Sequence, residues 1–171
     1  LIVNFMGSEA SNGSAYNVSR AISKPLGSLG SNPINGSFAK EKHGSKTLNG
    51  VIYCAISQID AIEAEAKEYE STTFEVYDCV SKASMGSGGM GGNHTFIKVK
   101  IKSNWFAVFE WTVDGLNCFL KDNLNQEKSS RYVGKHSLQH VYNKACQFSK
   151  KKYDIFENQC NQWNDRVINS L

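Results

Sequence analysis

Two side chains, Cys160 and His94, have the types and surroundings that nucleophilic chemistry needs. Cys160 lies within "YDIFENQCNQW" (153–163), and Trp163, Val167 and Leu171 follow it at spacings of three to four residues. This spacing predicts a helix that begins near Cys160 and packs one face inward. At a helix N-terminus, free backbone N–H groups and the helix dipole favour a thiolate and provide donors for an oxyanion. The alternative for Cys160 is a small buried apolar side chain.

A thiolate nucleophile needs a base nearby, and the chain offers four histidines: His43, His94, His136 and His140. The first lies in an irregular stretch, and the last two border or lie on an amphipathic helix whose apolar face does not need them, so we interpret all three as surface residues. His94 follows the glycine run 85–92 and opens a strand, where rigid β-structure can aim an imidazole at a substrate. We therefore predict His94 as the general base for Cys160.

Several neighbours of these two residues receive structural interpretations. We take Glu110 as a surface or rim carboxylate, with orientation of the His94 ring as the alternative, and leave it outside the catalytic pair. Asn158 is expected to cap the Cys160 helix through its side chain. The three tryptophans are expected in the core or in a groove wall: Trp105, Trp111 and Trp163. The glycine run lacks the context of a phosphate-binding loop and instead suits close passage of an extended peptide.

Composition excludes several classes of function. The net charge is only +3 and the lysines of "KVKIK" (98–102) alternate, which is typical of the solvent face of a strand rather than of a nucleic-acid site. Five cysteines without a C-x-x-C pair predict neither a disulfide framework nor a metal site, and favour a reducing, cytoplasmic or nuclear setting. No cofactor is expected. No segment is long and apolar enough for membrane insertion, although "MGSEAS" from Met6 fits a myristoylation pattern if Met6 is the initiator.

The hydrophobic pattern predicts a single α+β domain. Residues 1–47 are rich in Gly, Ser and Asn and are expected to be irregular or partly disordered, whereas residues 48–171 form the folded domain. Helical spacing of apolar residues predicts a long helix over 48–70, and amphipathic spacing predicts another from Ser137. Strands are expected at 72–80, from His94 to Ile101 and over "WFAVFEWTV" (105–113), within an antiparallel sheet of four to six strands. "GLNCFLKDNL" (115–124) is expected to be a short helix, and "NQEKSSRYVG" (125–134) a polar loop.

Three stretches, taken in order, resemble the PPPDE family of permuted papain-fold peptidases, which includes desumoylating isopeptidases and deubiquitinases. "FEVYDCV" (74–80) is similar to the first strand of the family, and "GGNHTFIKV" (91–99) to its glycine-then-histidine segment. "YDIFENQCNQW" is similar to its cysteine motif. The resemblance covers about residues 72–171 and implies a permuted papain-like, NlpC-superfamily-like thiol hydrolase fold. A histidine that precedes the cysteine is typical of the permuted folds, whereas ordinary papain-like enzymes and NlpC-type peptidases place the cysteine first.

This resemblance implies a cysteine isopeptidase that cleaves an amide bond through a thioester, with His94 as base, Cys160 as nucleophile and a ubiquitin-like modifier or peptide as substrate. The chain departs from the family at Gln159, where asparagine is usual, and at Gln162–Trp163, where histidine and phenylalanine are usual. One alternative is a thiol acyltransferase or phospholipase of the lecithin:retinol acyltransferase type, whose Asn-Cys-Glu-His-Phe motif is not found here. The other is a non-catalytic binding module of the same fold.

Overall fold

A computed structural model describes residues 45–83, 92–122, 124, 127–154 and 156–171. The described chain is α+β. Its strands are β1 (Ser45–Leu48), β2 (Val51–Cys54), β3 (Thr73–Ala83), β4 (Gly92–Lys102), β5 (Trp105–Thr112), β6 (Gly115–Asp122) and β7 (Ser129–Ser137). Its helices are α4 (Ile59–Glu68), α5 (Leu138–Phe148) and α6 (Cys160–Ile168). None of these helices is long and apolar enough to cross a membrane.

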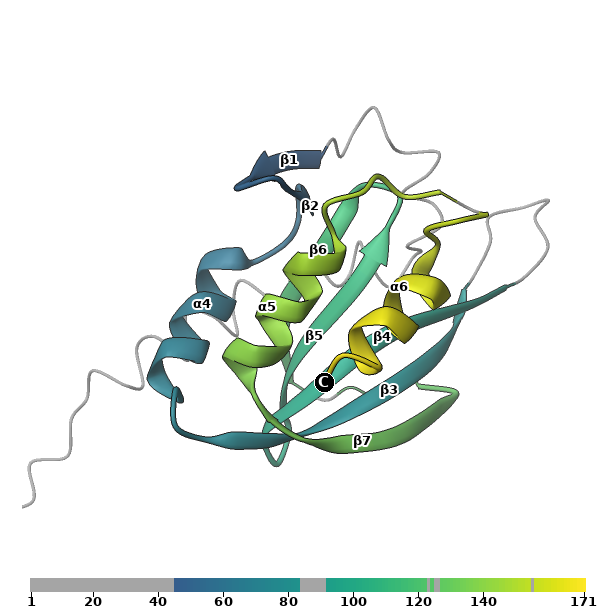
Figure 1. Cartoon of the computed structure of the whole chain (residues 1–171). Helices are drawn as coiled ribbons and strands as arrows, with labels where there is room; N and C mark the ends of the chain where they lie inside the picture. Colours follow the sequence, from purple (N-terminus) through teal and green to yellow (C-terminus); the bar gives the residue numbers. More distant parts are fainter. Residues whose placement is uncertain (1–44, 84–91, 123, 125–126, 155) are drawn as a thin grey trace, which may run out of the picture.

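The strands of the described chain form one seven-stranded sheet in the order β1-β2-β6-β5-β4-β3-β7. Every neighbouring pair is antiparallel except β2 and β6, which are parallel. Figure 1 shows α5 and α6 lying across the same face of this sheet, with α4 beside α5. The sheet is therefore mostly antiparallel, as predicted, but has more strands than the four to six expected.

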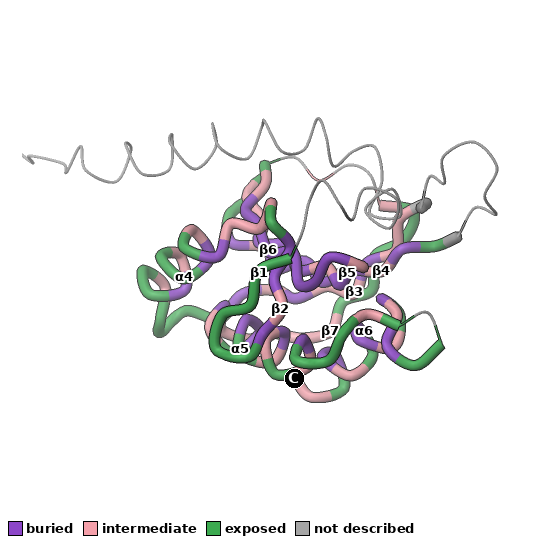
Figure 2. Tube along the Cα trace, turned by 90° about the horizontal axis from the view of Figure 1, so that it is seen from above, coloured by how far each residue is buried: buried purple, intermediate pink, exposed green. Residues whose placement is uncertain are grey.

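Apolar side chains alternate between the two faces of the sheet. Ile97 and Val99 of β4 join the main core beneath the helices, whereas Phe96 belongs to a smaller cluster on the opposite face. Figure 2 shows the buried residues concentrated between the sheet and the helices. Trp111 and Trp163 are fully buried there and stack with ring centroids 6.2 Å apart, which confirms their predicted core positions.

The predicted long helix over 48–70 is wrong, because its first part is a β-hairpin. Asn49 and Gly50 both have positive φ angles, of 50° and 76°, and they join β1 to β2 with Leu48 opposite Val51. An Asn-Gly pair favours this tight turn, whose backbone twist matches the twist of the flanking strands. Helix α4 begins only at Ile59. The predicted boundary at residues 47 and 48 also falls inside β1.

The predictions of a short helix at 115–124 and of a loop at 125–134 are also wrong, the first because the segment is buried and the second because it is exposed. The stretch 115–124 contains strand β6 rather than a helix. Leu116 and Leu120 pack in the main core and Phe119 in the cluster on the opposite face, so Gly115 to Leu120 are all buried and lack polar alternation. The polar stretch 125–134 contributes to β7 rather than remaining a loop. Its residues pair with β3 at the edge of the sheet and stay largely exposed, so polarity did not exclude a strand.

Strands β3, β4 and β5 and helices α5 and α6 are of the type predicted from the sequence. Ser137 caps α5, because its hydroxyl accepts a hydrogen bond from the backbone N–H of His140. One side chain of "KVKIK" contradicts expectation: Lys98 is buried, forms an ion pair with Glu127 at 2.5 Å and lies over the Tyr77 ring. The predictions for residues 1–44 and for most of the glycine run lie outside the described residues.

Candidate active site

Cys160 is the first residue of α6, as predicted, and is only 8 % exposed. The preceding residue, Gln159, has an extended backbone (φ −77°, ψ 173°) and occupies the N-cap position. Its backbone N–H donates to Oε1 of Gln162, one turn into the helix, at 3.1 Å. Trp163 and Val167 anchor the same helix in the core. The thiol therefore lies at the positive end of a helix whose first turn is held by the Gln159–Gln162 capping contact and by core packing of Trp163.

His94 lies near the start of β4, where the strand leaves one of its partners. It pairs with Ser81 of β3, but the registered pairing of β4 with β5 begins two residues later, at Phe96 and Glu110. His94 and Thr95 thus lie beyond the paired part of the β4–β5 ladder, where a side chain from α6 can reach them. The imidazole is 4 % exposed and stacks against Phe96 with centroids 6.4 Å apart.

The structure brings Cys160 and His94 together, and each changes the acidity of the other. Burial alone would raise the pKa of the Cys160 thiol, but hydrogen bonding to His94 and its positive charge, with help from Thr95, lower that pKa below its ordinary value. Burial alone would lower the pKa of the His94 imidazole, but the neighbouring Cys160 thiol and the negative charge of the nearby Glu110 carboxylate raise it. Both pKa shifts are in the direction that favours a thiolate beside an imidazolium.

Glu110 and Asn117 continue this chain of contacts across the sheet. Oε2 of Glu110 lies 3.9 Å from Nε2 of His94, and Nδ2 of Asn117 donates to the same carboxylate oxygen at 3.4 Å. Asn117 lies opposite Glu110 in the β5–β6 pairing and is fully buried. The structure thus supports the alternative for Glu110, a carboxylate beside the imidazole, rather than an unpaired rim residue. Sequence analysis missed Asn117.

Polar groups from three segments surround the sulfur. Oδ1 of Asn161 accepts a hydrogen bond from Oγ1 of Thr95 at 3.2 Å and lies 3.6 Å from the Cys160 Sγ. The hydroxyl of Tyr153 accepts a hydrogen bond from the backbone N–H of Cys160, and burial, together with the nearby sulfur, raises the pKa of that phenol. These groups link the nucleophile to β4 and to the loop that precedes α6.

The loop before Cys160 is fixed by many hydrogen bonds. Asp154 and Asn158 exchange backbone hydrogen bonds, and the Asp154 carboxylate accepts from the backbone N–H groups of Phe156 and Glu157 at 2.7 and 3.0 Å. Nε2 of Gln162 donates to the Phe156 carbonyl at 2.7 Å. The phenyl ring of Phe156, in contrast, is 79 % exposed. The loop therefore presents one aromatic side chain beside the first turn of α6.

Asn158 does not cap α6, which corrects the prediction made from sequence. Its Nδ2 donates to the carbonyls of Lys151 and Lys152, and its Oδ1 accepts from Arg166. The Asn158 carbonyl accepts from the Trp111 ring at 2.9 Å. The Asn158 side chain therefore joins the end of the loop to its start at Lys151–Lys152 and to Arg166 of α6, while Gln159 takes the N-cap position.

A buried polar contact attaches α6 to β3. Nδ2 of Asn164, a residue only 2 % exposed, donates to Oδ1 of Asp78 at 2.6 Å. The other oxygen of Asp78 pairs with Arg131 of β7 at 2.8 Å. The aspartate of the "VYD" segment thus fixes the helix that bears the nucleophile.

The other cysteines and histidines do not share this environment. All five cysteines are free, and burial raises the pKa values of Cys54 and Cys79 to about 11, opposite in direction to Cys160. His136 and His140 lie on β7 and at α5, where their rings stack 5.8 Å apart. His43 lies outside the described residues. Within the described ranges, no group of three or more His, Cys, Asp or Glu side chains could hold a metal ion.

Comparison with known proteins gives no further assignment: no family model, no curated protein and no solved structure matches the chain.

Proposed function

We propose that this protein is a cysteine hydrolase that cleaves an amide bond with Cys160 as nucleophile and His94 as general base. The observation that carries the proposal is the contact between the thiol at the start of α6 and the buried imidazole of β4, which lowers the pKa of one and raises that of the other. Paired shifts of this kind, in the direction that creates a thiolate, are typical of catalytic cysteines.

Each group then has a defined task in the reaction. Nε2 of His94 faces Glu110, so Nδ1 is the nitrogen that would take the proton of the thiol. The Cys160 sulfur attacks the amide carbon, and the imidazolium then protonates the departing amine, which leaves a thioester. Water activated by the neutral imidazole attacks the thioester, releases the acid and restores the thiol. Glu110, supported by Asn117, acts as a positioning residue that stabilises the imidazolium.

The substrate we propose is the extended C-terminal tail of a ubiquitin-like modifier, as the resemblance to PPPDE peptidases implies. The finer fold class, a permuted papain-like hydrolase, is part of the same proposal and is supported by the order of histidine strand and cysteine helix. The exposed Phe156 ring on a fixed loop beside α6 is suited to contact an apolar side chain of such a tail.

A non-catalytic binding module is the second candidate, and one observation favours it. Cys160 and His94 are only 8 % and 4 % exposed, so a substrate carbonyl reaches the sulfur only if neighbouring side chains move. An inert module would keep the fold and the polar contacts but would not react with a carbonyl electrophile.

The test uses ubiquitin and SUMO that each carry an electrophile at the C-terminus. Covalent capture of the wild-type protein is expected, with loss in Cys160→Ala and in His94→Ala. Matched replacements outside the site, Cys54→Ala and His140→Ala, should retain capture. Equal capture of Cys160→Ala would refute the site assignment. Failure of the wild-type protein to react, together with an alkylation rate at Cys160 no greater than that of an ordinary thiol, would favour the binding module.

A further inference from the structure

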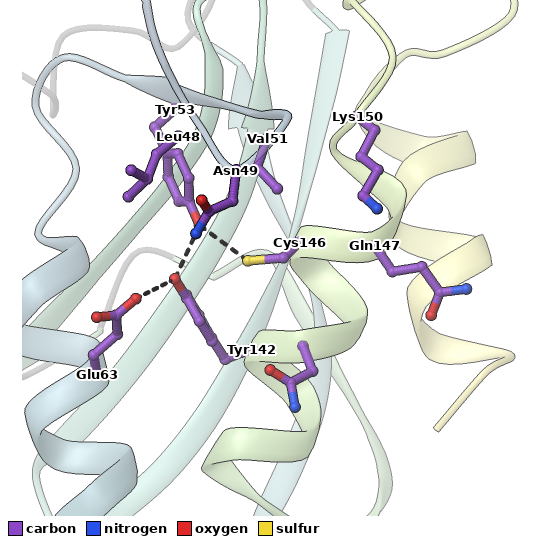
Figure 3. Close-up of a pocket in the computed structure, with 10 residues that line it drawn as sticks. Leu48, Asn49, Val51, Tyr53, Glu63, Tyr142, Cys146, Gln147 and Lys150 are labelled. Atoms are coloured by element: carbon purple, nitrogen blue, oxygen red, sulfur yellow. Dashed lines mark hydrogen bonds between the residues drawn. The ribbon is translucent and has the colours of Figure 1, made fainter.

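A second cavity, of about 340 Å³, lies between the β1–β2 turn, α4 and α5 (Figure 3). It shares no lining residue with the candidate active site. Its floor is formed by Tyr53 and Tyr142, which are 2 % and 8 % exposed, and by the half-buried Cys146. Glu63 lines it from α4, and Lys150 lines it just beyond the end of α5. A volume of this size is at the lower end of the range, about 300–1,000 Å³, typical of small-molecule sites.

Four of these side chains form a continuous chain of hydrogen bonds. The Tyr142 hydroxyl lies 2.8 Å from Oε1 of Glu63, and 2.9 Å from the hydroxyl of Tyr53. The Tyr53 hydroxyl lies 3.0 Å from the Sγ of Cys146. Figure 3 shows this chain crossing the floor of the cavity from Glu63 of α4 to Tyr142 of α5, then to Tyr53 of β2 and back to Cys146 of α5.

The chemistry of the four groups fixes the direction of every bond. A carboxylate can only accept, so Tyr142 must donate its single proton to Glu63. The oxygen of Tyr142 therefore accepts from Tyr53, which has no second proton to give. The oxygen of Tyr53 in turn accepts from the Cys146 thiol, whose pKa is raised by burial. All protons on the floor thus point toward Glu63 and none remains for a ligand.

These four groups offer only lone pairs, with a carboxylate at one end, so an ammonium group would find acceptors and a negative charge among them. The amides of Asn49, Asn143 and Gln147 also line the cavity and can donate as well as accept, so the preference for a cation rests on Glu63. Leu48, which is 45 % exposed, and the buried Val51 add apolar lining beside the floor.

The positive charge of Lys150 defines the far end of the cavity. Tyr142 and Cys146 lie one turn apart on α5, and Lys150 follows two residues after the helix ends at Phe148. Figure 3 shows Glu63 and Lys150 on opposite sides of Tyr53 and Cys146. A ligand that reaches both charges must be extended, with its positive group at the Glu63 end and a negative group at the Lys150 end.

We propose that this cavity binds an ω-amino carboxylate, that is, an ammonium and a carboxylate joined by an apolar stem, as at a C-terminal lysine. The ammonium group contacts Glu63 and the tyrosine oxygens, the stem lies against Leu48 and Val51, and the carboxylate faces Lys150. The site is independent of the Cys160–His94 pair.

Three probes of matched length test the proposal on the full chain by calorimetry and by chemical-shift changes: 6-aminohexanoate, hexylamine and 1,6-diaminohexane. The expected order of affinity is 6-aminohexanoate, then hexylamine, then the diamine, with about tenfold between the first and last because Lys150 repels a second cation. Equal affinity for all three probes, or shifts outside the lining residues, would overturn the proposal.

Two variants locate the charges. Glu63→Gln is expected to weaken 6-aminohexanoate binding about tenfold, whereas Glu68→Gln, on the same helix but outside the lining, should not change it. Lys150→Met is expected to weaken 6-aminohexanoate severalfold and leave hexylamine unchanged, with Lys151→Met as its control. Because Lys150 is exposed, this second variant remains informative even if Glu63→Gln disturbs folding. If both variants bind 6-aminohexanoate as tightly as the wild-type protein does, the assignment of Glu63 and Lys150 to the two ends is refuted.

Discussion

At the scale of single residues, the molecule treats its cysteines in two ways. Burial holds four thiols in their protonated form, and the pKa values of Cys54 and Cys79 are raised to about 11. Cys160 is also buried, but hydrogen bonding to His94, the charge of its imidazole and hydrogen bonds with Thr95 outweigh burial and lower its pKa. The neighbouring His94 therefore distinguishes the Cys160 thiol from the other four.

The acidity of Cys160 gives a prediction for pH. A thiol with a lowered pKa keeps its thiolate at lower pH than an ordinary cysteine and loses it only as the pH falls through that lowered value. In His94→Ala, burial remains without the cation, so the pKa rises above the ordinary value. We expect alkylation of Cys160 at pH 6.5 to slow by about tenfold or more, with the acid limb of the profile moving to higher pH. Superimposable profiles, measured by iodoacetamide labelling and mass spectrometry, would contradict this account.

Phe156 carries the second prediction at this scale. Its backbone is fixed by Asp154 and Gln162 while its ring is exposed, so the ring is pre-organised to contact a partner at little entropic cost. Phe156→Ser should weaken recognition of the electrophilic modifier about tenfold and leave the maximal capture rate and the iodoacetamide rate unchanged. Phe156→Leu should restore most of the recognition. Tyr132→Ser, a change at another exposed aromatic residue, is the control.

At the scale of elements, α6 depends on β3 as well as on its own apolar face. The Asn164–Asp78 hydrogen bond is largely buried, whereas the Arg131 side chain on the same carboxylate is 67 % exposed. A buried amide left without its acceptor costs much more free energy than an exposed ion pair contributes. The two contacts of one carboxylate therefore differ in their importance for stability.

This difference predicts unequal effects of two alanine replacements. Asp78→Ala should lower the free energy of unfolding by about 1–3 kcal/mol, because Asn164 Nδ2 loses its partner. Arg131→Ala should lower it by less than about 1 kcal/mol. Urea unfolding of both variants checks the order, and equal losses would show that the carboxylate acts mainly through Arg131.

The hydrophobic pattern of the sequence predicted some of these strands and helices and missed others. Strand β4 was predictable because Ile97, Val99 and Ile101 alternate with polar residues, and α6 because Cys160, Trp163 and Val167 repeat at helical spacing. The β1–β2 hairpin was missed because its apolar residues also fit a helical period, although Asn49–Gly50 was a usable turn signal. β6 was missed because burial on both faces removes alternation.

The residues that support His94 left little local signal in the sequence. Glu110 and Asn117 lie near His94 only because of the β4–β5 and β5–β6 registers, which depend on how whole strands pair. The residue types and spacing that led to Cys160 and His94, and the resemblance that supported them, rested on short segments around each residue. They offered orientation of the ring by Glu110 only as an alternative and contained no information about Asn117.

At the scale of the whole molecule, the sheet is unevenly supported. β3, β4 and β5 pair over long registers beneath α5 and α6, whereas β1 is exposed along its length and β2 has one registered pair with β6, Tyr53 with Leu116. The β1–β2 hairpin is therefore the part of the described chain with the least support, apart from its contacts at Ile52 and at the second cavity.

This unevenness predicts the order of hydrogen exchange. Amides of β1 should exchange first, by local opening, while those of β4 and β5 should exchange only with global unfolding. If 6-aminohexanoate binds the second cavity, it should slow exchange in β2 as well, because the bound state must hold Tyr53 in place. Uniform protection across the sheet, measured by mass spectrometry, would contradict the uneven support.

The joining of Cys160 and His94 across 66 residues of sequence also has a consequence for measuring the protein itself. In the unfolded chain the five thiols have ordinary and nearly equal pKa values. In the folded chain the pKa of Cys160 is lowered, whereas burial raises the pKa values of the other four thiols. Brief labelling in mildly acidic buffer would mark native molecules alone, so the yield at that sulfur counts the folded fraction of any sample directly.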